Sequence, residues 1–189
     1  ALLPVSEQMP NETYKPHDRI KVFITKVEKT TKGPQIFVSR THPGLLKRLF
    51  EIEVPEIFDG TVEIKSVARE AGDRSKISVH AENSEVDPVG ACVGTKGARV
   101  QAIVNELKGE KIDIVQWSED PVTFVANALS PSKVLDVQVN EDDKATRVVV
   151  PDYQLSLAIG KRGQNARLAA KLTNWKIDIK SETDARELG

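Results

Sequence analysis

The spacing of hydrophobic and polar positions predicts β structure at the start of the chain. Residues 19–27 alternate apolar and polar side chains, as a half-buried strand does. A turn signal at 30–34 leads to a second strand at 36–38, and the apolar residues 2–5 predict a third. Three short strands with polar connections indicate part of a small barrel, whose open edges need protection.

From residue 43 onward the pattern predicts two copies of one α/β unit. The first copy has a helix over 43–51, strands over 62–67 and 76–80, a helix from Asp87-Pro88, a helix over 97–107 and a closing strand over 111–115. The second copy has a helix over 120–129, a hairpin over 134–139 and 146–150, helices over 152–159 and 164–172, and a closing strand over 175–179. The repeated order of elements indicates an internal duplication.

A Gly-x-x-Gly loop joins two adjacent helices in each copy. The loops are Gly94-Thr95-Lys96-Gly97 and Gly160-Lys161-Arg162-Gly163, which begin 66 residues apart, and Ile-Asp-Ile recurs in both closing strands. Two glycines three apart allow a sharp turn, and the helix that follows presents unpaired N–H groups and the positive end of its dipole. One such loop is more often a plain helix–helix turn, but the duplicated pair predicts two phosphate sites.

Composition adds a segregated charge to this picture. The net charge is only −1, yet residues 15–48 carry nine Lys or Arg against two acids, and residues 160–180 carry six against Asp178 alone. A basic face of this kind fits a polyanion. For the run at 15–48, a solvated strand face is nearly as good an interpretation as an RNA track. Aromatic residues make up 5% of the chain, so stacking is expected to contribute little.

Several classes of site are not supported by the sequence. Cys92 is the only cysteine, which rules out an intrachain disulfide and favours a reducing cytoplasm. The three histidines are scattered without a second ligand at metal spacing, so we expect no metal. No nucleophile has a recognisable base nearby, and no phosphate-binding P-loop appears; we therefore expect neither an enzyme nor a cofactor. No run has transmembrane length, and we expect no signal peptide.

Longer strings around the loops resemble the NusA family of bacterial transcription factors. The matching strings are residues 86–101, 53–57 and 157–165. The resemblance covers essentially the whole chain and implies an α+β multi-domain fold: a partial OB-type β-barrel of the S1 kind at 1–42, then bacterial-type KH domains at 43–118 and 119–189. Each KH domain is expected to pack its helices on one face of a three-stranded sheet. The family's earlier OB strands and polymerase-binding domain have no counterpart here, so we expect the chain to be a fragment.

The same resemblance implies that the loops bind RNA, because a KH glycine loop clamps the backbone of about four nucleotides. We expect Lys96, Lys161 and Arg162 to meet phosphates, with Arg99 and Arg167 reaching the same strand and Gln164 and Asn165 reading base edges. The candidate RNA-binding residues are Gly94, Thr95, Lys96, Gly97, Arg99, Lys111, Gly160, Lys161, Arg162, Gly163, Gln164, Asn165, Arg167, Lys171 and Lys176. The second loop has one more cation, so it is expected to supply more of the salt-dependent affinity.

The predicted function is single-stranded RNA binding within a factor that modulates RNA polymerase pausing, termination and antitermination. Expected partners are nascent RNA, RNA polymerase through upstream residues, and other transcription factors; we expect a cytoplasmic monomer that does not bind membranes. One alternative is the RNA-binding end of an exoribonuclease of the polynucleotide phosphorylase kind, although there a single KH domain precedes the S1 domain. Another is a KH-type protein adaptor without RNA binding, against which the cationic residues of both loops argue.

Overall fold

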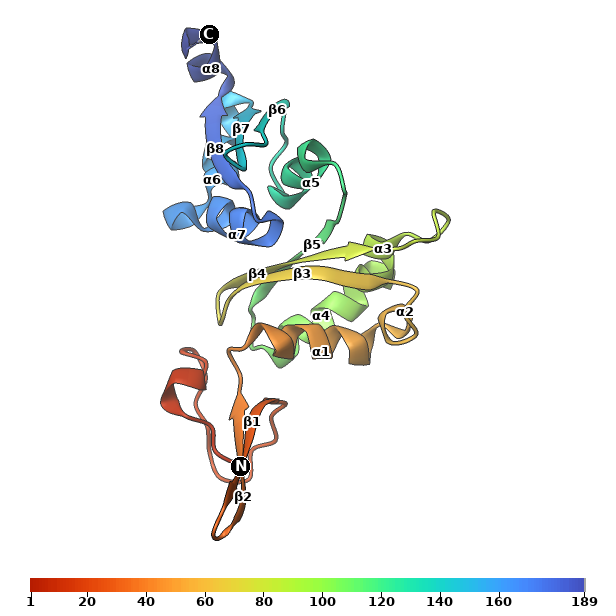
Figure 1. Cartoon of the computed structure of the whole chain (residues 1–189), viewed down its shortest axis with the longest axis vertical. Coiled ribbons are helices and arrows are strands. Elements are labelled where there is room, and N and C mark those ends of the chain that lie inside the picture. Colours follow the sequence, from red (N-terminus) through yellow and green to blue (C-terminus); the bar gives the residue numbers. More distant parts are fainter. Residues whose placement is uncertain (189) are drawn as a thin grey trace.

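The computed structural model describes residues 1–188, and it arranges the chain as three parts along one long axis (Figure 1). The first part is an antiparallel hairpin of β1 (Phe23–Thr30) and β2 (Gly33–Ser39), preceded by the short helix η1 (Val5–Glu7). Two of the three expected strands are therefore confirmed. The third is wrong: Leu2 forms only an isolated bridge to Phe37, because Pro4 has no N–H for a ladder and η1 follows at once.

Arg40 joins this N-terminal part to the unit that follows. Its side chain is fully buried, forms ion pairs with Glu12 and Glu106, and donates to the carbonyl oxygens of Lys21 (2.8 Å) and Glu106 (3.0 Å). Met9 is also buried in the core of that unit. At least one cation of the basic run 15–48 therefore has a structural task, not a ligand-binding one.

The first α/β unit contains the predicted elements and two additional short helices, one of them a 3₁₀ turn within the glycine loop. Its elements are α1 (Pro43–Glu53), α2 (Pro55–Phe58), β3 (Glu63–Glu70), β4 (Arg74–His80), α3 (Pro88–Val93), η2 (Thr95–Gly97), α4 (Ala98–Glu106) and β5 (Lys111–Gln116). The Asp87 carboxylate accepts a hydrogen bond from the Gly90 N–H, which confirms the predicted N-cap. In the sheet, β4 is central, antiparallel to β3 and parallel to β5.

The second unit repeats this topology. Its elements are α5 (Pro121–Ala128), β6 (Asp136–Asn140), β7 (Ala145–Val150), η3 (Asp152–Gln154), α6 (Leu155–Ile159), η4 (Lys161–Gly163), α7 (Gln164–Thr173), β8 (Lys176–Ser181) and α8 (Glu182–Leu188). Again the central strand, β7, is antiparallel to one neighbour and parallel to the closing strand. Arg74 faces Lys111 in one register and Ala145 faces Lys176 in the other, which confirms the duplication. Helix α8 was not predicted.

Each unit has its own apolar core, and the two cores meet at the first sheet. Helices cover one face of that sheet through residues such as Leu46, Phe50 and Ile103. The opposite face contributes Ala68 and Val115 to the core of the second unit. Helix α7 therefore lies across β3 and β4, as Figure 1 shows, and the two units form a packed pair.

Polar contacts hold the same interface. The Ser66 hydroxyl donates to the Leu172 carbonyl oxygen at 2.9 Å. The Lys76 ammonium group, which is fully buried, donates to the carbonyl oxygen of Ser130 and to the carboxylate of Asp113, both at 2.8 Å. Burial of the charged form lowers the pKa of Lys76, and the Asp113 charge opposes that shift. The second unit therefore covers one face of the first sheet and buries the Lys76–Asp113 charge pair at the interface.

Candidate nucleic-acid interface

The two Gly-x-x-Gly loops have the same backbone conformation. Gly94 has φ 78° and ψ 173°, and Gly160 has φ 79° and ψ 170°. The last glycine of each loop is also left-handed, with φ 76° at Gly97 and 75° at Gly163. Two loops of different sequence therefore make one turn, each placed directly before the N-terminus of a helix, α4 in the first copy and α7 in the second.

The first glycine of each loop is required by close packing as well as by its backbone angles. A Cβ atom at Gly94 would lie 2.7 Å from Cγ of Arg99 and 3.0 Å from its backbone nitrogen. At Gly160 it would lie 2.7 Å from the backbone nitrogen of Asn165. A Cβ atom at Gly97 would meet nothing within 4 Å, and one at Gly163 would meet only Nη1 of Arg167, at 3.9 Å. At these last glycines, therefore, only the left-handed φ favours glycine.

The cationic side chains of the loops lie on the surface. Lys96 and Arg162 each have a positive φ, 55° and 56°, which is uncommon for residues other than glycine and costs about 1–3 kcal/mol. Both side chains are exposed, as is that of Lys161. Among residues 1–188, no carboxylate forms an ion pair with any of the three. The strained position of each loop therefore carries a cation that is available to an anionic ligand.

Two candidate residues lie behind the loops and support them. Arg99 donates from Nη1 to the carbonyl oxygen of Ala91 (2.7 Å) and to Glu56 (2.8 Å). Asn165 donates from Nδ2 to the carbonyl oxygens of Ala158 (2.9 Å) and Leu129 (3.0 Å). Both residues are fifth after the first glycine, and both satisfy a carbonyl left free where the preceding helix ends. Asn165 is 1% exposed, so the expectation that it reads base edges is wrong.

Gln164 and Arg167 are directed toward the first unit. The Arg167 guanidinium forms a two-bond ion pair with Glu70, with Nε and Nη2 each 2.8 Å from a carboxylate oxygen. Its Nη1 donates to the carbonyl oxygen of Arg162 at 3.0 Å. Gln164 donates to Asp73 at 2.6 Å. Counted from the first glycine of the loop, Arg167 occupies the position that Gln101 has in the first copy, and not that of Arg99.

A cationic hollow lies at the other end of α7. Two candidate residues, Lys171 and Lys176, border it together with Lys144 and Trp175, and its volume is about 430 Å³. Nζ of Lys144 lies 5.5 Å from the centre of the Trp175 ring. Neither Lys144 nor Trp175 was among the candidates predicted from the sequence, although Trp175 directly precedes a candidate lysine. Lys111, at the start of β5, is exposed as well.

The apolar residues around the loops divide into two groups. The isoleucines of both Ile-Asp-Ile strands are partly buried and pack against the cores. Leu157 and Ile159, on α6 before the second loop, are 42% and 36% exposed. The second loop therefore has an accessible apolar surface beside its cations.

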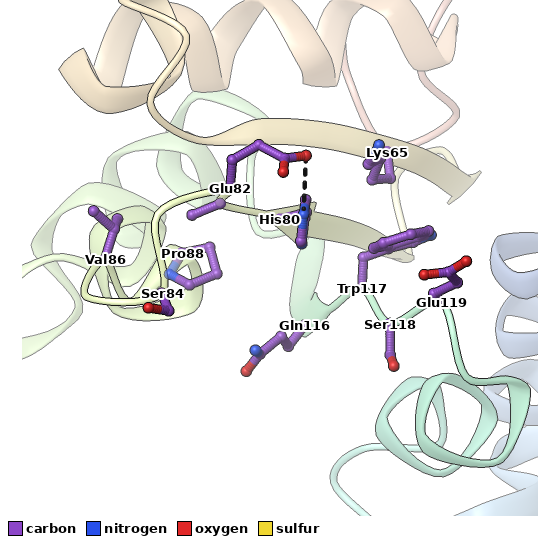
Figure 2. A pocket seen from close by; sticks show the side chains of 11 residues that line it. Lys65, His80, Glu82, Ser84, Val86, Pro88, Gln116, Trp117, Ser118 and Glu119 are labelled. Atoms are coloured by element: carbon purple, nitrogen blue, oxygen red, sulfur yellow. Dashed lines mark ion pairs between the residues drawn. The ribbon is translucent and has the colours of Figure 1, made fainter.

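A separate hollow lies at the ends of β4 and β5 (Figure 2). Its volume is about 630 Å³, and it is bordered by Lys65, His80, Trp117 and Glu119. The Trp117 ring packs against two neighbouring side chains: Nζ of Lys65 lies 4.8 Å and the His80 ring 5.0 Å from its centre. Trp117 therefore packs within the protein, and the mixed charges do not match those of the glycine loops.

Other side chains that could react or bind a metal ion are not placed to do so. Cys92 is fully buried, and burial raises the pKa of its thiol to about 12, which keeps it protonated. Across the described part of the chain, no group of three His, Cys, Asp or Glu side chains is arranged to hold a metal ion. No helix among residues 1–188 is long and apolar enough to cross a membrane.

Two α/β units of this topology, each with a Gly-x-x-Gly loop between paired helices, define a tandem KH protein. Residues 40–117 match the family described as NusA-like first KH domain, and residues 121–187 match the NusA-like second KH domain. The chain belongs to the NusA family, as its resemblance predicted.

Curated relatives agree with this assignment over nearly the whole chain. The chain is 87% identical over 189 residues to the transcription termination/antitermination protein NusA of Bacillus subtilis, covering 100% of this chain and 51% of that protein. It is 54% identical over 177 residues to the Thermus thermophilus protein of the same name, covering 94% and 46%. It therefore spans about half the length of the curated relatives it matches.

A solved structure gives the fold alone. The crystal structure of APE1850 covers 71% of this chain and 96% of its own, with a TM-score of 0.51 and 22% identity. Such a distant likeness supports the α+β architecture and carries no information about a ligand.

Proposed function

We propose that this chain is the single-stranded RNA-binding region of a NusA-type transcription factor. The observation that carries the proposal is the pair of loops: one backbone conformation, used twice, each time with exposed cations before a helix N-terminus. Phosphates bind at helix N-termini because the unpaired N–H groups and the dipole both favour negative charge. Lys96, Lys161 and Arg162 add Coulomb attraction, which is the part of the affinity that salt weakens.

Bases would lie beside the loops and not on them. In KH domains the loop clamps the backbone while the bases meet the neighbouring groove. Leu157 and Ile159 offer an apolar surface there in the second unit. Because phosphate contacts position a strand without reading it, sequence preference would come from this groove. With about four nucleotides per module, the packed pair would hold roughly eight or more nucleotides of one strand.

The remaining assignments follow from the family. The relatives are named for transcription termination and antitermination, and we infer that this chain supplies RNA contact to that activity. We assign contact with RNA polymerase to parts of the protein outside this chain. We further propose that residues 1–42 are the end of an S1-type OB domain, with KH domains at 43–118 and 119–189, in a cytoplasmic, monomeric protein without catalytic activity.

RNA titration at several salt concentrations tests the proposal. We expect Lys161→Asp/Arg162→Asp to weaken binding of single-stranded RNA by more than about tenfold, because cations become acids at the phosphate site. Thr95→Asp/Lys96→Asp should have the same effect to a smaller degree. The control Lys47→Asp/Arg48→Asp makes the same charge change on exposed side chains of α1. It should retain most of the affinity, and that result would also show that this end of the basic run 15–48 is a solvated face. Unchanged affinity in both loop variants would overturn the proposal.

A further inference from the structure

We propose that Glu70 of the first KH unit is a positioning residue for the glycine loop of the second. Its carboxylate holds the Arg167 guanidinium, and Arg167 in turn holds the Arg162 carbonyl within the loop. We call this chain of contacts, Glu70–Arg167–Arg162, the loop clamp. The inference rests on the proposed function, since it concerns how the second loop is kept ready for a phosphate.

The geometry of the clamp leaves Arg167 one orientation. Two of its nitrogens lie 2.8 Å from the two oxygens of Glu70, which fixes the plane of the guanidinium. The third nitrogen, Nη1, is then directed at the Arg162 carbonyl oxygen, 3.0 Å away. Glu70 lies at the end of β3, and Gln164, in the same turn of α7, donates to Asp73 of the following turn. One short segment of the first unit therefore grips the start of α7.

The atom that the clamp holds belongs to the strained part of the loop. Arg162 has a left-handed φ of 56°, and its carbonyl shares a rigid peptide plane with the N–H of Gly163. That N–H donates to the Gly160 carbonyl oxygen at 3.1 Å, closing the turn. A hydrogen bond from Arg167 on one side of the plane and the loop's own bond on the other keep the plane in place. The direction of the exposed Arg162 side chain follows from that plane.

The first loop has no such clamp. The residue equivalent to Arg167 is Gln101, which donates along its own helix to Asn105 at 3.0 Å. Nowhere in residues 1–188 does a side chain donate to the Lys96 carbonyl oxygen in the way that Arg167 donates to that of Arg162. The two loops thus share one backbone conformation but are held by different contacts. The first loop is held by its own unit alone, and the second is also held by the neighbouring unit.

A plain ion pair between domains would be the simpler explanation. The Arg167 and Glu70 side chains are 44% and 24% exposed, and ion pairs on a protein surface contribute little to stability. A second explanation is that Glu70 competes with RNA for Arg167. The three explanations make different predictions, because the clamp requires an arginine at 167 whose orientation is fixed by an acid at 70.

Glu70→Gln separates the clamp from competition. Removing a negative charge should by itself strengthen binding of a polyanion, and freeing Arg167 should do the same. If the clamp operates, Glu70→Gln nevertheless weakens RNA binding by about three- to tenfold, because the phosphate contact of Arg162 loses its geometry. The matched control is Glu82→Gln, which removes the same charge from a side chain that is 91% exposed; it should bind as well as the wild type or slightly better.

The exchanged pair Glu70→Arg/Arg167→Glu separates the clamp from a plain ion pair. This variant restores opposite charges across the interface, but glutamate at 167 cannot donate to the Arg162 carbonyl. Restored RNA affinity would show that only attachment of the two units matters and would overturn the clamp. Affinity that stays low, with a thermal unfolding midpoint near that of the wild type, is the expected result.

Hydrogen exchange gives a readout that does not depend on RNA. In Glu70→Gln the Gly163 amide should exchange faster than in the wild type, while the Gly97 amide of the first loop should not change. Equal exchange at Gly163 in both proteins, or tighter RNA binding by Glu70→Gln than by Glu82→Gln, overturns the clamp while the proposed function stands. A wild-type chain that does not bind single-stranded RNA overturns the proposed function instead, and the exchange measurement still decides whether the loop is held.

Discussion

The two KH units have one topology, but the sheet faces that their own helices leave uncovered have different surroundings. The first sheet is covered by α5 and α7 of the second unit, and its polar side chains there are paired. On the second sheet the corresponding strands present Arg147 and Asp178 to the solvent. Covering one sheet makes the two units a packed pair, whereas the uncovered sheet leaves the far end of the second unit accessible.

The two copies also differ at the end of the sheet where the closing strand begins. Lys111 and Lys176 make the same backbone hydrogen bond. Each donates its N–H, at 3.0 Å, to the carbonyl oxygen of the residue before the central strand, which is Asp73 in one copy and Lys144 in the other. The residue before Lys111 is Glu110, fully buried in an ion pair with Arg69, whereas its counterpart Trp175 borders a hollow. In the first copy this corner is a buried ion pair, and in the second it presents exposed cations around a hollow.

The Ile-Asp-Ile repeats supply the largest test of this comparison. Asp113 accepts hydrogen bonds from Arg74 and from the buried Lys76, while the equivalent Asp178 is 57% exposed, with Lys180 at 3.9 Å. We expect Asp113→Asn to lower the free energy of unfolding by about 3 kcal/mol, because it leaves a buried ammonium without its partner. Asp178→Asn should change it by less than about 0.5 kcal/mol. Chemical denaturation of both variants at neutral pH measures the difference.

The same pair determines how stability responds to acid. Burial raises the pKa of Asp113, but hydrogen bonds and charge from Arg74 and Lys76 outweigh it, so the pKa lies below its ordinary value near 3.8. A carboxyl group with a depressed pKa in the folded state contributes stability above its unfolded pKa and loses it as pH falls through the folded one. The wild type should therefore lose stability below about pH 4 more steeply than Asp113→Asn. Parallel acid profiles would show that Asp113 is not the group responsible.

The residues that support the loops give a test of intermediate size. Asn165 is buried and satisfies two carbonyl oxygens, whereas Arg99 is 32% exposed and satisfies one. Asn165→Ala should cost about 2 kcal/mol of unfolding free energy, since it leaves buried acceptors without donors. Arg99→Ala should cost about 1 kcal/mol. Equal losses in thermal unfolding would mean that the two side chains support their loops to the same extent, contrary to their burial.

Sequence was sufficient for those parts of the fold that local chemistry decides. Asp87 and Pro88 marked the start of α3, and the Ile-Asp-Ile strings marked both closing strands, as the structure confirms. Tertiary contacts decided the rest. Asp113 and Asp178 lie in identical strings, and only the packing of the second unit on the first sheet buries one of them. Helix α8 was missed because its apolar residues are too few for a periodic pattern.

The positions of the two glycine loops were predicted correctly, but the roles of the residues around them only in part. Lys96, Lys161 and Arg162 are exposed on the loops, and their contact with RNA stays a prediction. Asn165 was misinterpreted because it follows the loop among polar residues, although its spacing from the first glycine equals that of Arg99. Aligning the two copies glycine by glycine would have shown that this position supports the loop and that Arg167 corresponds to Gln101.

The smallest effect is expected at the cationic corner of the second unit. If Lys144 and Lys171 contact the RNA backbone, each Lys→Gln substitution should weaken binding about twofold and reduce the slope of log affinity against log salt by about 0.7, the loss of one phosphate contact on a single strand. Lys133→Gln, which removes one exposed charge away from this corner, is the matched control. Because α7 is 10 residues long, its two ends are about 15 Å apart. Short RNA that fills only the loop should therefore be insensitive to both substitutions, and a longer strand should respond to them. An equal response of short and long RNA would mean that these lysines act only through the general electrostatic field of the protein. The corner of the second copy would then differ from that of the first in its charge, but it would not contact the RNA.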